Sequence, residues 1–363
     1  MSDRESVPGP LPATAAMNWL LHRAAGVDAP GILLGELCNR LMAEAVPIEG
    51  TLLKIASFDP LVASSRLRWQ RSNGRITEEV LLHGMPVLEN APDSIRVLTV
   101  MLPGTRHEID WTAEESAGFS LEQRFYLETI SLVMAAPLQV VVGREATRSL
   151  LRAYLGRRSA DKVLGGTVRR GAGEMIQAMI WISDLRDFTR LSQMLPPEQV
   201  IIALNDCCAR LVGAIHPFGG EVLKFIGDGL LAIFPLAPHG TQAACAAALS
   251  AVRAARQGMA RLDEQRVRIG LPPLPFGIAL HLGAVMYGNI GAPDRLDFTA
   301  IGPAVNLTSR IEGLCRRLAC SVLISEAVST QCSEKLVPIG RHSMRGIKEP
   351  VTLFTLPELA PAT

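Results

Sequence analysis

Two aspartates stand beside apolar, strand-like runs in the second half of the sequence. Asp184 follows the run QAMIWIS, and Asp228 lies within EVLKFIGDGLLAIF. The second run is typical of a β-hairpin of the Asp-Gly kind, which would place Asp228 at a strand end near Asp184. Either aspartate taken alone is more often a turn residue. Two converging carboxylates, however, suit Mg²⁺, which also binds substrate phosphates.

The chemistry expected of such a pair is a displacement at phosphorus. Two metal ions, Mg²⁺ or Mn²⁺, could share the carboxylates of Asp184 and Asp228. One ion would lower the pKa of an attacking hydroxyl, and the other would neutralise a leaving pyrophosphate. The pair therefore predicts a site with two divalent ions that works on a nucleotide-like substrate.

The elements that must hold this pair are readable from the hydrophobic pattern. After the first strand, the segment from Asp184 to Thr189 is expected to turn into a helix. A second helix is expected to begin at Pro196, because apolar side chains then recur every three or four residues and would pack on a sheet. Gly219-Gly220 would close that helix ahead of the hairpin.

Composition excludes several other kinds of chemistry. The chain has 36 Lys and Arg against 35 Asp and Glu, a net charge of +1, which gives no support to nucleic-acid binding. None of the seven cysteines forms a CxxC pair, so zinc or redox-motif chemistry is not expected and the thiols should be reduced. We expect no signal peptide, because the first residues are polar and no apolar run follows them. The most apolar stretch, Leu127 to Val142, is too short to span a membrane. We expect a cytoplasmic protein with no transmembrane segment.

The length of 363 residues predicts two domains. We expect a disordered tail at 1–14, a regulatory domain at 15–143, a linker or signalling helix at 144–173, a catalytic domain at 174–357 and a tail at 358–363. In the first half, helices are expected at Met17–His22, Gly31–Ala45 and Ser120–Val142. Short strands are expected at Gly50–Ser57, Ser65–Gln70 and Val97–Leu102. This order is typical of a small α+β sensor of the GAF or PAS sort, and a dimerising cap without a ligand has comparable weight.

Three segments of the second half resemble the class III adenylate and guanylate cyclases. They read WISDLRDFTRLS, GGEVLKFIGDGLLAIF and DRLDFTAIGPAVNLTSRIE, in family order, and the resemblance covers roughly Met175 to Leu356. It implies an α+β fold, a ferredoxin-like α/β sandwich with a central antiparallel sheet. It also implies ATP or GTP as substrate and cyclisation by attack of the ribose 3′-hydroxyl on the α-phosphorus.

The resemblance assigns roles to individual residues. Asp184 and Asp228 match the metal ligands, and the backbone of Leu185 matches the segment beside them. The substrate set is Phe188, Thr189, Lys224, Gly227 and Thr299, with Lys224 and Thr299 at the purine-reading positions. Asn306 and Arg310 match the catalytic Asn and Arg that orient the ribose and stabilise charge on the transferring phosphorus.

Hydrogen-bond chemistry favours ATP. Lys224 can only donate, which suits adenine N1, and the hydroxyl of Thr299 can accept from the 6-amino group. A guanylate or mixed cyclase stays open as an alternative, as does a catalytically weak, nucleotide-binding regulatory homologue.

Three positions depart from the common family pattern, and the role of a further pair of basic residues is left open. Thr299 stands where Asp is frequent, which resembles the class IIIb subgroup and raises a bicarbonate response as a hypothesis. Asp187 replaces the usual glycine and adds negative charge near the metal pair. Pro303 follows Gly302 at a helix start, where Pro is tolerated. Arg345 or Lys348 could contact phosphates, or both could be surface charges.

The resemblance implies a head-to-tail homodimer. In this family the metal aspartates and the purine, ribose and charge-stabilising residues of one site come from different subunits. This chain carries both sets once, so two copies could form two equivalent sites.

Overall fold

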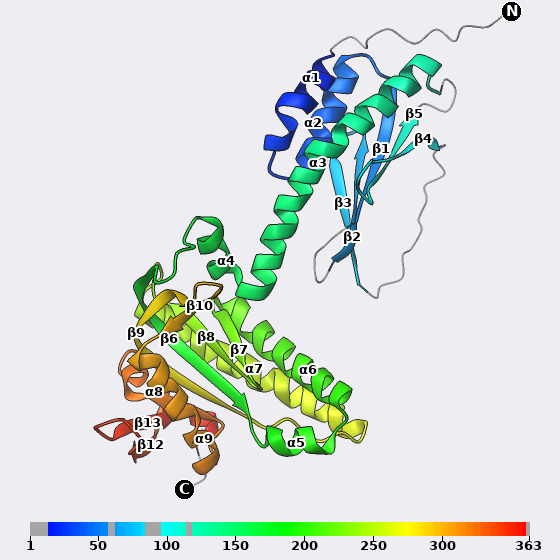
Figure 1. Cartoon of the computed structure of the whole chain (residues 1–363). Helices are drawn as coiled ribbons and strands as arrows, with labels where there is room; N and C mark the ends of the chain where they lie inside the picture. Colours follow the sequence, from blue (N-terminus) through cyan, green and yellow to red (C-terminus); the bar gives the residue numbers. More distant parts are fainter. Residues whose placement is uncertain (1–13, 57–61, 84–95, 114–117, 361–363) are drawn as a thin grey trace, which may run out of the picture. The chain divides into compact units, whose positions relative to one another are not determined.

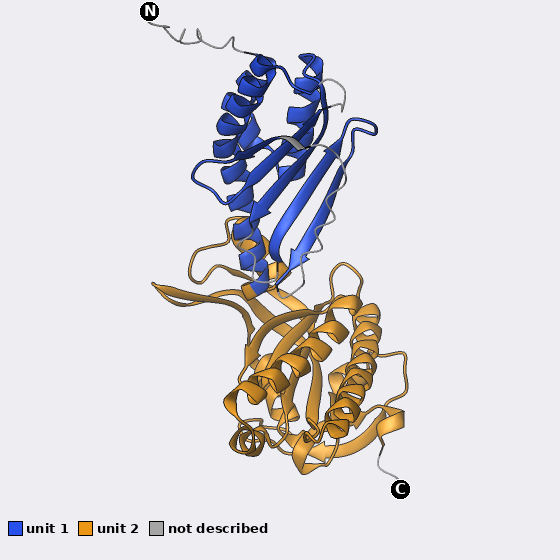
Figure 2. Ribbon diagram, turned by 90° about the vertical axis from the view of Figure 1, so that its right-hand side faces the viewer, with its two compact units in different colours: residues 1–153 blue, residues 154–363 orange. Residues whose placement is uncertain are grey.

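A computed structural model describes residues 14–56, 62–83, 96–113 and 118–360. The tail predicted at 1–14 lies outside these residues except for Thr14, and so do the last three residues of the tail predicted at 358–363. The chain divides into two compact units, Met1–Ala153 and Tyr154–Thr363, coloured blue and orange in Figure 2.

Unit 1 is a five-stranded antiparallel sheet with helices against its core. Its elements are α1 (Ala15–His22), η1 (Ala24–Gly26), α2 (Pro30–Ala43), β1 (Ile48–Ala56), β2 (Val62–Gln70), β3 (Ile76–Leu82), β4 (Arg96–Met101), β5 (Glu108–Ala113) and α3 (Leu121–Leu155). The strands lie in the order β3-β2-β1-β5-β4. Buried tryptophans of β2 and β5, Trp69 and Trp111, pack with leucines of α2 in one core. The comparison of this unit with GAF or PAS domains stays a prediction.

Helix α3 runs past the point where the sequence predicted an end. The predicted helix stopped at Val142, but α3 continues to Leu155 and contains Pro137 in its interior. The segment after Gly143 is rich in good helix formers, so one helix replaces the predicted break. Gly156, with φ of 79°, separates α3 from α4 (Arg157–Leu164).

Unit 2 is built on an eight-stranded sheet. Its remaining elements are β6 (Gly173–Leu185), α5 (Phe188–Met194), α6 (Pro197–Ile215), η2 (His216–Phe218), β7 (Glu221–Ile226), β8 (Gly229–Pro235), α7 (Thr241–Arg268), β9 (Phe276–Ala292), β10 (Arg295–Ile301), α8 (Pro303–Glu312), α9 (Leu314–Arg317), β11 (Val322–Ser325), α10 (Glu326–Ser329), β12 (Val337–His342), β13 (Val351–Thr355) and η3 (Pro357–Leu359). The central strands lie in the order β9-β6-β8-β7, all antiparallel to their neighbours. This is the predicted ferredoxin-like α+β arrangement.

Strand β6 places a core on each face of the sheet. Met179 and Trp181 point to the side covered by α6 and α7. Ala178 and Ile180 point to the other side, where they pack with residues of β10 and α8. Figure 1 shows the helices α6 and α7 on one side of the sheet and α8 on the other. Because side chains alternate along a strand, both faces of β6 are buried in a core. Asp184 lies just beyond this apolar run.

Two helical segments are long and apolar enough to cross a membrane by length and composition, namely α3 and Pro197–Phe218. Each also contributes buried side chains to a core, for example Met134 of α3 and Leu211 of α6. The absence of a transmembrane segment stays a prediction.

Candidate active site

Asp184 and Asp228 lie side by side. Asp184 is near the end of β6, and the two-residue loop Gly227-Asp228 joins β7 to β8. The β6–β8 register pairs Ser183 with Leu230, which brings the hairpin tip to Asp184. The two carboxyl groups share a hydrogen bond. Burial, the charge of Asp228 and this bond together raise the pKa of Asp184 to about 6.

The hairpin differs in type from the one predicted. Its loop residues are Gly227 and Asp228, because Ile226 pairs with Gly229. Gly227 has φ of 61° at the first loop position, where a type II′ turn places glycine, so the expected Asp-Gly turn is wrong. Gly229 is needed for a different reason: a Cβ there would lie 2.7 Å from Oδ1 of Asp184. Asp184 and Asp228 can approach each other because Gly229, at the start of β8, has no side chain.

Glu312 is a third acid next to the pair, and sequence reasoning missed it. It ends α8, and its Oε1 lies 2.6 Å from where a Cβ of Gly277 would stand. Gly277 pairs with Asp184 across β6 and β9. Burial, followed by the charges of Asp184 and Asp228, raises the pKa of Glu312 to about 7, against the opposing effect of Arg186. The sequence does contain a signal for Glu312, because this glutamate lies two residues after Arg310 on the inward face of an amphipathic helix.

The donor set fits a divalent cation bound through few protein ligands. Within the described ranges, no group of three or more His, Cys, Asp or Glu side chains is arranged as a complete metal cage. Two adjacent carboxylates whose mutual repulsion raises a pKa are, however, a site that a cation would relieve. Asp184 and Asp228 would hold it, with the neighbouring backbone of Leu185.

Asp187 adopts a backbone conformation that explains the glycine usual at this position. Its φ is 58°, in the left-handed region that glycine and, less often, aspartate adopt. Its Oδ1 lies 2.7 Å from the guanidinium of Arg316 on α9. The added charge is therefore paired, and it lies at the start of α5, next to Phe188 and the exposed Thr189.

Lys224 lies on β7 and Thr299 on β10, two strands that contact each other but are not paired. The Nζ of Lys224 is 2.7 Å from Oδ2 of Asp297, two residues before Thr299 on β10. Thr299 is only 2% exposed, and its hydroxyl has no hydrogen-bond partner within the described chain. A base could bond this hydroxyl only after neighbouring groups move, whereas the ammonium of Lys224 is partly accessible.

Asn306 and Arg310 share an outward face of α8. They are four residues apart, and both are exposed, while Ala304, Thr308 and Ile311 are buried on the opposite face. Arg345 and Lys348 are also exposed, in the turn before β13. A contact of either residue with phosphates stays a prediction.

One copy of the chain does not bring all the predicted residues together. Thr299 pairs with Gly288, and Gly288 pairs with Gly173 at the start of β6, whereas Asp184 lies at the other end of the same strand. The eleven steps along the strand from Gly173 to Asp184 span roughly 36 Å. In the described part of the chain, no hydrogen bond or ion pair joins the metal pair to Thr299, Asn306 or Arg310.

Comparison with known proteins shows which family the second half of the chain matches. Residues 173–358 match the family described as the adenylate and guanylate cyclase catalytic domain. An adenylate cyclase of Anabaena cylindrica is 36% identical over 44% of this chain and 31% of its own length. Adenylate cyclase 1 of Rhizobium meliloti is 31% identical over 45% of this chain and 25% of its own length. The chain thus spans less than a third of either relative.

A solved structure of a bacterial light-regulated adenylyl cyclase has a similar fold. It is 26% identical with a TM-score of 0.52, covering 63% of this chain and 64% of that chain.

Proposed function

The chain belongs to the adenylate and guanylate cyclase family through residues 173–358, and we propose that it converts ATP to 3′,5′-cyclic AMP and pyrophosphate. The observation that carries the proposal is the contact between Asp184 and Asp228 at the ends of three adjacent strands. Two adjacent carboxyl groups at the ends of these strands suit a site that binds a cation and a triphosphate.

The roles of the protein's own groups follow from their positions. Asp184 and Asp228 would hold Mg²⁺ or Mn²⁺, two ions per site. When bound, the metal would lower the pKa of the ribose 3′-hydroxyl and offset charge on the pyrophosphate. The first amides of α5, at Phe188 and Thr189, face the triphosphate. Arg310 stabilises negative charge on the α-phosphoryl group, and Asn306 orients the ribose.

Lys224 carries the preference for ATP. Its ammonium donates to adenine N1, an acceptor, whereas N1 of guanine is a donor. Leaving a donor facing a donor in a site closed to water costs a few kcal/mol, about a hundredfold in discrimination.

A mixed ATP and GTP cyclase is the second function that an observation favours. The hydroxyl of Thr299 is buried, so Lys224 would read the base alone until that hydroxyl is uncovered. A lone ammonium can also donate to O6 of guanine, which weakens discrimination.

Two copies of the chain form the site. The separation of Thr299 from Asp184 along β6 and the outward face of Asn306 and Arg310 support a head-to-tail dimer of unit 2. In it, the metal pair of one chain faces Lys224, Asn306 and Arg310 of the other, and symmetry makes two equivalent sites.

The test is an assay of the purified full chain with Mn²⁺ and either ATP or GTP, with cyclic nucleotides separated by chromatography. Cyclic AMP in excess over cyclic GMP is expected. Lys224→Glu, combined with a change at Thr299, should move the preference toward GTP. Absence of both products at micromolar dimer concentration would refute a cyclase, and more cyclic GMP than cyclic AMP would refute the base assignment.

A further inference from the structure

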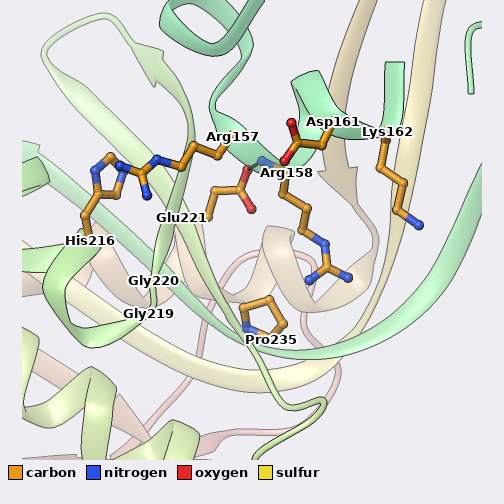
Figure 3. A pocket seen from close by; sticks show the side chains of 9 residues that line it. All are labelled: Arg157, Arg158, Asp161, Lys162, His216, Gly219, Gly220, Glu221 and Pro235. Carbon is orange, nitrogen blue, oxygen red and sulfur yellow. Dashed lines mark hydrogen bonds between the residues drawn. The ribbon is translucent and has the colours of Figure 1, made fainter. Parts of the chain in front are cut away.

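Helix α4 is capped by a residue from another element. Gly156 precedes the helix and offers no side chain, so the first amides of α4 need an outside acceptor. The backbone N–H groups of Arg158 and Ser159 donate to Oε1 of Glu221, at 2.7 and 3.4 Å. Glu221 is the first residue of β7. Figure 3 shows its carboxylate at the start of α4, between Arg157 and Arg158.

Further contacts fix α4 to the sheet of unit 2. The hydroxyl of Ser159 lies 2.8 Å from that of Tyr287 on β9, and both residues are buried. The guanidinium of Arg158 lies 5.6 Å from the centre of the Tyr287 ring. Lys162 is paired with Glu174 on β6 at 3.0 Å. Helix α4 is thus held by three strands of the catalytic unit, β6, β7 and β9.

Helix α4 meets β7 where the pairing of β7 with β8 is irregular. The β7–β8 register shifts between Val222 and Lys224. A bulge of this kind bends a strand and changes the direction of the next side chain, which here is Lys224. A Cβ on Gly156 would lie 3.0 Å from the carbonyl oxygen of Val222. The start of α4 therefore packs against the backbone just before the base-reading lysine.

The cap borders solvent. An open pocket of about 600 Å³ is lined by Glu221 together with Arg157, Arg158 and His216 (Figure 3). Burial raises the pKa of Glu221, although the amides of Arg158 and Ser159 act in the opposite direction. The carboxylate is thus in a place that is unfavourable for a charge unless α4 supplies its amides.

We propose that Glu221 is a positioning residue, which holds the first turn of α4 on β7 and thereby fixes the bulge that directs Lys224 toward the base. The inference rests on the proposed function, because its predicted effect on the KM for ATP assumes that the chain converts ATP. It makes the attachment of α4, the helix that follows α3 in the chain, a determinant of ATP affinity.

The test compares Glu221→Ala, Glu221→Gln and Gly156→Ala with wild type and with the control Glu264→Ala, all as full-length chains. Glu264 is an exposed glutamate of α7, distant in sequence from the cap. Hydrogen exchange of the amides at 156–164 reports whether α4 is held, and steady-state kinetics with Mn²⁺-ATP report KM and kcat separately.

Glu221→Ala should speed exchange in α4 and raise the KM for ATP about two- to thirtyfold, the factor that corresponds to a lost helix cap, with kcat within about twofold of wild type. Gly156→Ala should act in the same direction, because its φ of 79° and the contact with Val222 oppose a Cβ. Glu221→Gln keeps an acceptor oxygen and should stay within about threefold of wild type.

Three results would overturn the proposal. They are unchanged α4 exchange in Glu221→Ala, faster exchange with an unchanged KM, and a Glu221→Gln variant as impaired as Glu221→Ala. If Glu221→Ala does not fold, Gly156→Ala and Glu221→Gln decide the question. A wild-type chain that makes no cyclic nucleotide would refute the proposed function instead, and the exchange measurements would still decide whether Glu221 holds α4.

Discussion

The Nζ atom of Lys224 lies 2.7 Å from Oδ2 of Asp297, so the ammonium on β7 is directed at β10, the strand that carries Thr299. Asp297 and Thr299 are two residues apart and share a side of that strand. The ion pair therefore links Lys224 to the strand that carries Thr299, the other predicted purine-reading residue. It is also well exposed to solvent, with 33% of the lysine and 53% of the aspartate side chain accessible, so its free energy is small.

Replacement of this partner should weaken ATP binding modestly. In Asp297→Asn the ammonium keeps a hydrogen-bond acceptor but loses its counter-charge, and we expect the KM for ATP to rise about 1.5- to fivefold at low salt. The difference from wild type should shrink at 0.5 M salt, since screening weakens the pair. Kinetics at two salt concentrations measure this. An effect that grows with salt would contradict an ionic role.

Loss of Asp228 should abolish activity and metal binding together. Asp228→Ala removes half of the carboxylate pair, so cyclic AMP formation should fall roughly 100-fold or more. The variant should melt no lower than wild type without metal, because the repulsion with Asp184 is gone. The rise in melting temperature that Mn²⁺ gives wild type should disappear. Asp294→Ala, an exposed aspartate in the β9–β10 turn, is the control and should keep both properties.

Metal binding should weaken in acid. The pKa of Asp184 is raised to about 6 and that of Glu312 to about 7, so both bind protons more tightly in the folded chain. Their contribution to stability is thus full below the ordinary carboxyl pKa and is lost as pH rises through 6 to 7. Mn²⁺ must compete with the proton on Asp184, so the half-saturating Mn²⁺ concentration should rise as pH falls below about 6.

Glu312→Gln tests which of the two acids controls metal binding. The charge of Asp184 raises the pKa of Glu312 to about 7, so Glu312 is mostly protonated in the range where Asp184 titrates. The variant should therefore still lose Mn²⁺ binding below about pH 6, but it should lack the change in stability that wild type shows near pH 7. Thermal-shift titrations with and without Mn²⁺ between about pH 5 and 8 measure this, and a displaced loss of Mn²⁺ binding in the variant would show that the charge of Glu312 acts on Asp184.

Two inactive variants should complement each other if the site is shared between chains. Asp228→Ala damages the metal side, and Arg310→Ala damages the other side. A mixed dimer would contain one intact site and one with both defects, so an equal mixture that exchanges freely should recover about a quarter of wild-type activity. The rate of cyclic AMP formation at several mixing ratios measures the recovered activity. A mixture as inactive as its components would argue for a site within one chain.

The charge of Asp187 should matter little while Arg316 pairs with it. Asp187→Gly suits the φ of 58°, and we expect retained activity with a melting temperature within about 3 °C of wild type. Arg316→Ala should instead leave the aspartate unpaired near the start of α5 and raise the KM for ATP. If Asp187→Gly lost activity, the acid itself would be part of the site.

The catalytic unit was largely predictable because its signals are local. An apolar run ending in Asp184 and the hairpin around Asp228 each occupy about a dozen residues, and the sheet pairs them as expected. The hairpin type was mistaken because IGDG contains both a Gly-Asp and an Asp-Gly step, and only strand pairing decides which lies in the loop. The burial of Thr299 could not be predicted, because it depends on the pairing of β10 with β9.

Interactions between distant segments were not predictable. Glu312 comes near Asp184 only because α8 runs along β9, and Arg316 reaches Asp187 across more than a hundred residues. Strands β3 and β5 of unit 1 were missed because charged side chains interrupt their alternation. Helix α3 was cut short at a glycine that a long helix tolerates.

The left-handed conformation of Gly156 divides α3 and α4 into separate hydrogen-bond ladders. The two helices therefore do not form one continuous helix, and α4 is attached within unit 2 through the Ser159–Tyr287 contact and through Glu221 on the edge strand β7. An edge strand has a paired neighbour on one side only, so a shift of α4 would displace β7 with fewer broken backbone hydrogen bonds than an inner strand of the sheet would require.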